Sequence, residues 1–236
     1  MAHFRGSKVE RMAQLKEETV TEQTPLPAGD TRSPERWGAR DLALVAVFAA
    51  LVAASALVPG ISIGGVGVPI TIQTLAVVLT GLVLGGPRAI AAVGLYVVLG
   101  LAGLPIFSQG RAGLGVLAGP SAGYIIAFPL VAGLVGFLAT RVLRKRLKPR
   151  TLWFFLAAFG SSLLLTHTLG PLGIMINGRT SLSAAFLADL AFYPGDILKN
   201  LVAAPLAVAL HRAFPDILLR RAAAQGSPAP ASAEQR

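Results

Sequence analysis

Residues 42–58 read LALVAVFAALVAASALV, an apolar run in which Ser55 is the single polar side chain. The same character continues outward, because between residues 42 and 140 only Arg88 and Arg111 carry a formal charge. A soluble domain would have about 25 charged residues in a window of that length. The chain of 236 residues is 54% hydrophobic and 14% charged, with a mean hydropathy of +0.67. These values exclude an ordinary water-soluble globule and predict an integral membrane protein built of helices.

The apolar part of the chain is long enough for six membrane helices of about 20 residues each. Proline and glycine mark the ends of the segments, because neither residue continues a helix well. The helices expected from these marks cover residues 41–58, 70–84, 89–103, 121–143, 151–169 and 194–214. The predicted fold class is therefore all-α, an integral membrane protein with six transmembrane helices in a domain over residues 41–214.

The two ends of the chain and two internal stretches differ from these helices in composition. Residues 1–40 mix charges of both signs and contain three prolines, so we expect a disordered or weakly structured cytoplasmic tail. Residues 215–236, rich in Ala, Ser and Pro toward the end, predict a cytoplasmic C-terminal tail. Glycine-rich stretches at 60–67 and 110–119 are too irregular for contact with lipid, so their backbone is expected to be buried in protein or to face water.

Basic residues are distributed unequally between the two ends of the predicted helices. Twelve lie on one side, six of them between residues 141 and 150, whereas the other side has three, Arg111, Arg179 and Lys199. Because Lys and Arg favour the cytoplasmic side, both termini are predicted in the cytoplasm of a cell-membrane protein. The same distribution accounts for the net charge of +10, so we predict no nucleic-acid partner.

Asp196 and Lys199 are the clearest candidates for binding a polar ligand. An ionisable residue at membrane depth costs roughly 2.5–3.5 kcal/mol on insertion scales, so its presence calls for a reason. Pro194 suits a first helical turn, which places Asp196 near a helix N-terminus and Lys199 on the same face three residues later. The topology puts this helix start on the outer side. The pair is either a ligand site that points inward or an internal ion pair that only closes the helix.

Two further stretches contain candidate binding residues. Gly64–Thr74 leads into a predicted helix, and we expect a loop that covers a ligand from outside, with Gln73 beneath it. The alternative is that its threonines only cap the helix and that the polar groups pack between helices. Leu104–Tyr124 has glycines that partly mimic a dinucleotide-binding fingerprint, but no strand precedes them. We therefore expect a re-entrant loop that lines a cavity, with Tyr124 as an aromatic wall.

The remaining residues argue against catalysis. His167 has no Asp, Glu or second His near it in the sequence, and we interpret it as a packing histidine. Ser161 and Ser162 lack the context of a nucleophilic serine, the chain has no cysteine, and no P-loop signature occurs. We predict no enzyme activity, no cofactor and no metal site, and any active transport must be powered by another subunit. A membrane enzyme that uses His167 or Arg111 is disfavoured by the lack of a paired base.

Small residues recur on the first predicted helix. Ala46, Ala50 and Ala54 are spaced by four, and this spacing lets another helix approach closely. The stripe serves either internal packing or docking to a partner membrane subunit.

Five stretches in order resemble the BioY family, the biotin-binding S components of energy-coupling factor transporters. They are VPITIQTL at 68–75, LVLGGPR at 82–88, LYVVLGLAGLPIF at 95–107, GPSAGY at 119–124 and YPGDILK at 193–199. The likeness covers residues 41–212, nearly the whole membrane part. In one departure, the chain has Gly170-Pro171-Leu172-Gly173 where relatives often place a Trp after the glycine.

The resemblance implies a six-helix S component that binds biotin near the outer face and takes up the vitamin with a transmembrane coupling subunit and two cytoplasmic ATPases. Asp196 and Lys199 fall on the family's biotin-associated motif. With Gln73 and Tyr124, which the reading of the loops proposes, they are the four residues expected to bind the substrate. Ala46, Ala50 and Ala54 match the family's docking surface for the coupling subunit. An S component for another vitamin, or a biotin facilitator that works alone, remains an alternative.

Overall fold

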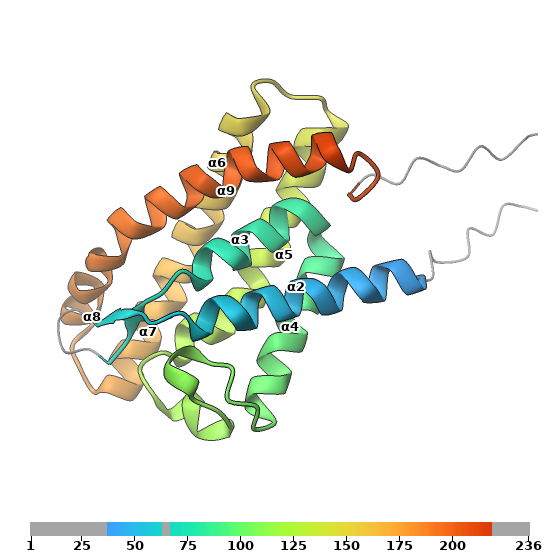
Figure 1. Ribbon diagram of the computed structural model, residues 1–236. Helices are drawn as coiled ribbons and strands as arrows, with labels where there is room; N and C mark the ends of the chain where they lie inside the picture. The colour runs from blue at the N-terminus through green and yellow to red at the C-terminus, as the bar shows by residue number, and fades with distance from the viewer. Residues whose placement is uncertain (1–36, 63–66, 219–236) are drawn as a thin grey trace, which may run out of the picture. The chain divides into compact units, whose positions relative to one another are not determined.

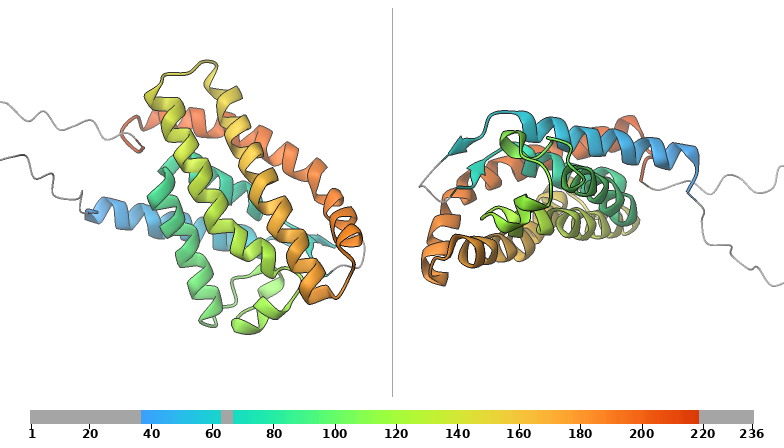
Figure 2. Two further views of the ribbon diagram at one scale, coloured as in Figure 1. Left: turned by 180° about the vertical axis from the view of Figure 1, so that it is seen from behind. Right: turned by 90° about the horizontal axis from the view of Figure 1, so that it is seen from below.

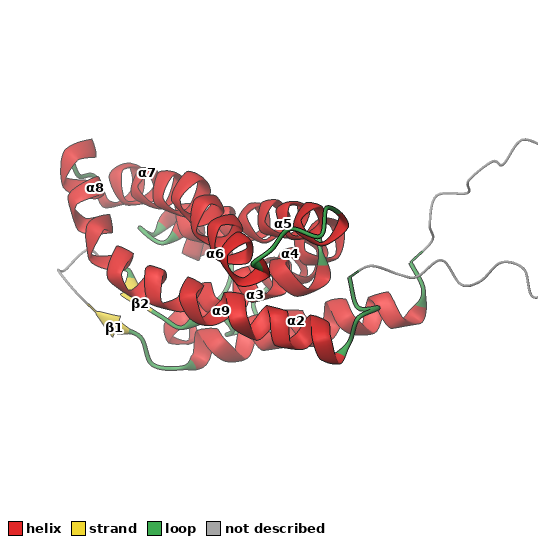
Figure 3. Ribbon diagram, turned by 90° about the horizontal axis from the view of Figure 1, so that it is seen from above, coloured by secondary structure: helices red, strands yellow, loops and turns green. Residues whose placement is uncertain are grey.

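The computed structural model describes residues 37–62 and 67–218, and helices make up most of them (Figures 1 and 3). The helices are α2 (Ala39–Leu57), α3 (Gln73–Leu84), α4 (Gly86–Leu101), α5 (Ala122–Arg144), α6 (Arg150–Ser161), α7 (His167–Gly178), α8 (Leu182–Asp189) and α9 (Tyr193–Ala213). A π-helical turn, Ser162–Thr166, joins α6 and α7 into one continuous helix. The described residues thus form six long helical segments and the short α8, which confirms the all-α prediction and its six helices.

The outer surface of the bundle is apolar, as a membrane protein requires. Three helical segments, α2, α5 and the joined α6–α7, are long and apolar enough to cross a membrane, and α3 and α4 are shorter apolar helices. Large side chains on the lower-hydropathy α9, such as Leu198 and Leu201, are more than half exposed. Exposed apolar surface on this scale marks contact with lipid or with another membrane protein.

Helix α3 lies at the centre of the bundle. Ten of its twelve residues are buried, and it packs against α2, α4, α5 and α9. The α4–α5 contact is very close, because a Cβ added at Gly136 would lie 2.4 Å from the carbonyl carbon of Gly85. Helix α5 and the α6–α7 segment run side by side, as Figure 2 shows from behind. The core is therefore a set of closely spaced backbones around α3.

Three helical segments differ from their predicted bounds by three residues or more, and one of them is α4, which begins at Gly86 and not at residue 89. Helix α3 begins at Gln73 and not at residue 70, because Pro69–Ile70 forms strand β2, which pairs with β1 (Ile61–Ser62) in an antiparallel hairpin. The fifth helical segment was predicted to end at residue 169 but continues to Gly178. Proline in a helix removes one hydrogen bond, and here the close packing of Gly173 against Gly123 of α5 holds the helix together beyond Pro171.

Other segments were not predicted or cannot be compared. Helix α8 was not predicted; Ser181 caps it by accepting a hydrogen bond from the backbone N–H of Ala184 at 3.2 Å. The predicted N-terminal tail lies outside the described residues up to residue 36, and the C-terminal tail lies outside them from residue 219. Part of the glycine-rich stretch at 60–67 is also outside them.

The connecting segments collect at one end of the bundle. The β1–β2 hairpin, the loop between α4 and α5, and the turn from α7 through α8 to α9 lie together, away from the loop between α5 and α6 (Figure 1). The α4–α5 loop contains two 3-10 turns, Ser108–Gly110 and Leu114–Ala118. These segments surround the mouth of the cavity described below.

Candidate ligand-binding cavity

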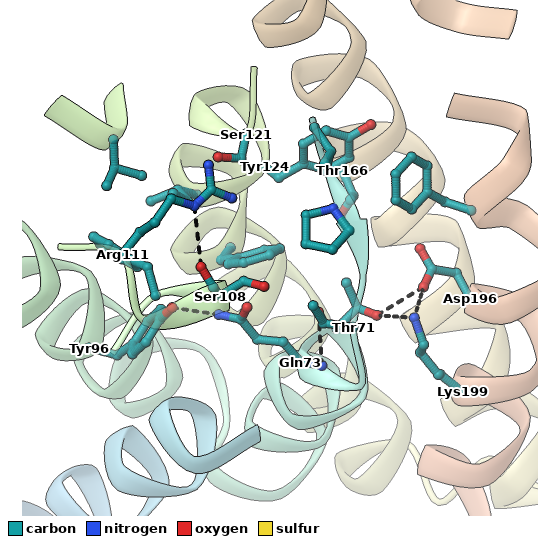
Figure 4. A pocket seen from close by; sticks show the side chains of 18 residues that line it. Thr71, Gln73, Tyr96, Ser108, Arg111, Ser121, Tyr124, Thr166, Asp196 and Lys199 are labelled. Carbon is teal, nitrogen blue, oxygen red and sulfur yellow. Dashed lines mark hydrogen bonds and ion pairs between the residues drawn. The ribbon is translucent and has the colours of Figure 1, made fainter. Parts of the chain in front are cut away.

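A cavity opens between the β2–α3 segment, the loop between α4 and α5, and the first turns of α5 and α9 (Figure 4). Its empty space, counted together with the open mouth, is about 600 Å³. The four residues predicted to bind a ligand, Asp196, Lys199, Gln73 and Tyr124, all line it. Residues more than 120 positions apart in the chain thus meet on one wall.

Asp196 and Lys199 form a closed ion pair on this wall. Lys199 Nζ donates to Asp196 Oδ1 at 2.8 Å and to Thr74 Oγ1 at 3.0 Å, and the Thr74 hydroxyl donates to the same carboxylate oxygen at 2.9 Å. Pro194 lies in the first turn of α9, as predicted, so Asp196 sits at the helix N-terminus. The Asp196 and Lys199 side chains are 5% and 16% exposed. The pair therefore faces the cavity and not lipid.

Gln73 lies in the first turn of α3 beneath the β1–β2 hairpin. Its side-chain amide donates to the Tyr96 hydroxyl at 2.7 Å, and its backbone N–H donates to Thr71 Oγ1 at 3.3 Å. The N-cap of α3 is Ile72, and no side chain makes a cap hydrogen bond there, so the alternative that threonine caps the helix was wrong. The ring of Tyr96 meets Phe107 edge to face, with centroids 5.5 Å apart. This contact fixes one end of the α4–α5 loop against α4.

The end of the cavity at the α4–α5 loop contains polar groups that were not predicted as binding residues. The Arg111 Nε donates to the backbone carbonyl of Ser108 at 3.2 Å, and its terminal amino groups have no hydrogen-bond partner in the described ranges 37–62 and 67–218. The hydroxyls of Ser108 and Ser121 are buried, and they too have no partner among those residues. In the sequence, the isolated charge of Arg111 was the only feature that pointed to these three polar residues.

Tyr124 forms the predicted aromatic wall, and its hydroxyl is directed to Asp189 of α8, with an O–O distance of 2.6 Å. Asp189 Oδ2 also lies 2.8 Å from His167 Nδ1, and His167 Nε2 is 3.5 Å from Asp196 Oδ2. His167 is buried, as a packing histidine would be, but the inference that no acid lies near it was wrong. The turn through α8 to α9 brings in two acids that are 22 and 29 positions away in the chain.

Ala46, Ala50 and Ala54 lie on the exposed face of α2, whereas Val45, Ala49 and Val52 face the core. Among the described residues no helix covers this alanine face, so internal packing does not account for the stripe. A flat strip of small residues is left open on the lipid-facing side of the bundle.

A membrane helix bundle with a small-molecule cavity and a few buried polar groups is the architecture of a solute-binding membrane protein. The fold agrees with that of one solved structure, "Crystal structure at 2.1 A of the S-component for biotin from an ECF-type ABC transporter". The TM-score is 0.69 at 25% identity, and the match covers 73% of this chain and 91% of that one.

The chain belongs to the BioY family, which matches residues 25–216, and this confirms the resemblance found in the sequence. It is 37% identical to a protein of Rhizobium etli named "Biotin transporter BioY", over 75% of this chain and 95% of the relative. A protein of the same name from Rhodobacter capsulatus is 36% identical, over 77% and 98% of the two chains. The relatives are transporters, so the prediction that this chain is not an enzyme is confirmed.

Proposed function

We propose that this protein is the substrate-capture subunit of a biotin uptake transporter. The observation that carries the proposal is the division of one cavity into two polar ends, Asp196 with Lys199 at one and Arg111 at the other. Figure 4 shows these groups on opposite sides, with apolar side chains around them. Biotin has the matching distribution of chemistry, with a ureido group at one end, an apolar ring and chain, and a carboxylate at the other end.

The Asp196 end suits the ureido group. A carboxylate accepts an N–H and an ammonium donates to a carbonyl oxygen, and both hydrogen bonds are charge-assisted. Thr74 supplies a hydroxyl that already contacts both partners. Gln73 and Tyr124 line the same cavity, Gln73 with its amide directed to Tyr96 and Tyr124 as an aromatic wall. In this orientation the ring system lies between Tyr124 and the first turn of α3.

The Arg111 end suits the carboxylate. A guanidinium with free amino groups binds a carboxylate through two parallel hydrogen bonds. The hydroxyls of Ser108 and Ser121, which have no partner in the part of the chain that the structure describes, line the same cavity and are donors for the remaining lone pairs. The lining also includes Phe107, Val116, Ile125, Phe128 and Phe192, which offer apolar surface for the ring sulfur and the alkyl chain. Each part of biotin therefore meets a surface of matching polarity.

Uptake requires partners, and we propose a transmembrane coupling subunit with two cytoplasmic ATPases, in line with the S-component fold. The coupling subunit would dock on the alanine face of α2 formed by Ala46, Ala50 and Ala54. The chain would cross the membrane several times with both termini in the cytoplasm, as the excess of basic residues at that side predicts. The cavity then opens toward the outside.

A titration of the purified protein with biotin tests the ligand. We expect a one-to-one complex that is not displaced by an excess of thiamine or riboflavin. Displacement by another vitamin would favour an S component of different specificity, and absent or only millimolar binding of biotin would refute the proposal.

The docking face is tested with an Ala50→Leu variant, which fills the gap that a neighbouring helix needs. Biotin binding should remain as in the wild type, while biotin uptake by cells that contain the coupling subunit and ATPases should fall at least tenfold. Ala184→Leu, the same change on the exposed surface of α8, is the matched control and should leave uptake unchanged. Full uptake without the coupling subunits would show a facilitator that works alone.

A further inference from the structure

A chain of buried polar groups lies behind Asp196, on the side away from Lys199. The Tyr124 hydroxyl donates to Asp189 Oδ1, and the other Asp189 oxygen lies 2.8 Å from His167 Nδ1. On the far side of the ring, His167 Nε2 is 3.5 Å from Asp196 Oδ2. His167, Asp189 and Asp196 are at most 3% exposed. One imidazole thus connects the carboxylate of the ligand site to a second carboxylate in the core.

The backbone just before His167 determines the direction of its imidazole. The π-helical turn Ser162–Thr166 ends directly before His167, and such turns re-register the side chains that follow. Thr166 then lines the cavity while His167 points to the two acids. A Cβ added at Gly170 would lie 2.3 Å from the Tyr124 ring, so glycine at this position lets the ring approach α7 closely enough for its hydroxyl to reach Asp189. Tyr193 covers the imidazole at a centroid distance of 4.2 Å.

The two ring nitrogens differ in their contacts. Nδ1 has a short hydrogen bond, whereas Nε2 is buried and has no hydrogen-bond partner within the described part of the chain. Each ring nitrogen has a carboxylate oxygen as its neighbour, Asp189 Oδ2 at Nδ1 and Asp196 Oδ2 at Nε2. A buried donor without a partner is costly, and Asp196 Oδ2 lies 3.5 Å from this nitrogen.

We propose that His167 is a positioning residue for biotin binding, and that it orients the Asp196 carboxylate through its Nε2–H while Asp189 and Tyr124 hold the ring in place. This inference rests on the proposed function, because Asp196 is the group that meets the ligand. Lys199 and Thr74 are hydrogen-bonded to one oxygen of Asp196, and His167 Nε2 lies 3.5 Å from the other. The carboxylate therefore has a polar neighbour on each side.

Two amide variants separate the two nitrogens. Glutamine places its N–H near the position of Nε2 and keeps the contact with Asp196, whereas asparagine places its N–H near Nδ1 and keeps only the contact with Asp189. We expect His167→Asn to weaken biotin binding about tenfold and His167→Gln to stay within about threefold of the wild type. His211→Gln is the matched control, since His211 is also buried but contacts the Leu82 carbonyl of α3 and does not line the cavity. It should leave biotin affinity unchanged.

Equal losses of affinity in His167→Asn and His167→Gln would overturn the proposal, because a residue that only fills space does not distinguish the two amides. Nuclear magnetic resonance of ¹⁵N-histidine-labelled wild type and Asp196→Asn, both without biotin, is a second test that does not depend on folding of the His167 variants. We expect a proton on Nε2 of His167 in the wild type and a shifted Nε2 signal in Asp196→Asn. An unmoved signal would refute the contact, whereas failure of the wild type to bind biotin would refute only the proposed function.

Discussion

The two ends of the cavity are built in opposite ways. At the α9 end, Asp196, Lys199 and Thr74 satisfy one another, and every contact among them is 3.0 Å or shorter. At the loop end, within the described residues, the Arg111 side chain donates only to a backbone carbonyl, and the hydroxyls of Ser108 and Ser121 have no partner. The first end rests on regular helices and the second on a loop of short 3-10 turns.

The difference shows how a cavity at membrane depth can hold charge. A paired carboxylate and ammonium neutralise each other, which lowers the cost of keeping both away from water. Such a pair is already organised for a ligand that is neutral at that end. An unpaired guanidinium instead favours a ligand that brings a negative charge. We therefore expect the α9 end to determine most of the affinity and the loop end to select for an acidic ligand.

The largest effect is expected at the α9 end. Asp196→Ala or Lys199→Ala leaves the other member of the pair buried without its partner. Each variant should weaken biotin binding by about 1–3 kcal/mol in a calorimetric titration, where about 1.4 kcal/mol corresponds to a tenfold loss of affinity. The double variant Asp196→Leu/Lys199→Met removes both charges and should unfold at a higher temperature than either single variant while still binding biotin poorly. Normal biotin binding in both single variants would mean that the pair only closes the helix.

A smaller and more selective effect is expected at the loop end. Arg111→Gln should weaken the binding of biotin about tenfold, because a charge-assisted hydrogen bond is lost, but should leave the binding of biotin methyl ester unchanged. The two ligands measured on one preparation provide the control. An equal loss for acid and ester would show that Arg111 shapes the loop and does not contact the carboxylate.

The smallest effect is expected for the serine hydroxyls beside Arg111. Ser121→Ala should weaken biotin binding by about 0.5–1.5 kcal/mol, the value of one neutral hydrogen bond. The melting temperature of the empty protein should not fall, because the variant removes a buried hydroxyl that has no partner in the described structure. Thr80→Ala is the contrasting control, since the Thr80 hydroxyl is satisfied by Ala76 and lies outside the cavity. It should leave biotin binding unchanged.

The sequence predicted the parts of the molecule that depend on local pattern. The apolar runs placed the helices within a few residues, and Pro194 with the spacing of Asp196 and Lys199 predicted their shared helix face. The β1–β2 hairpin and α8 were missed, because two-residue strands and an eight-residue helix leave no periodic signal. The long α6–α7 segment was cut short at residue 169, because Gly170-Pro171 is typical of a helix end.

The contacts within the site could not be predicted, because they join residues from separate elements. His167 has no acid near it in the sequence, yet it lies between Asp189 and Asp196, since α8 turns the chain back over α7. Nothing in the sequence distinguishes Ser108 and Ser121 from other serines, because their burial at the loop end depends on how the loop folds. Arg111 alone had a signal, as one of two charges in a window of 99 residues.

The most direct test of the two-ended cavity is a calorimetric titration of the wild-type protein with biotin and, side by side, with biotin methyl ester. Both ligands should bind at one site per chain, the acid about tenfold more tightly, because each keeps the ureido group while only the acid can pair with Arg111. Equal affinities, or no binding of either ligand, would contradict this account.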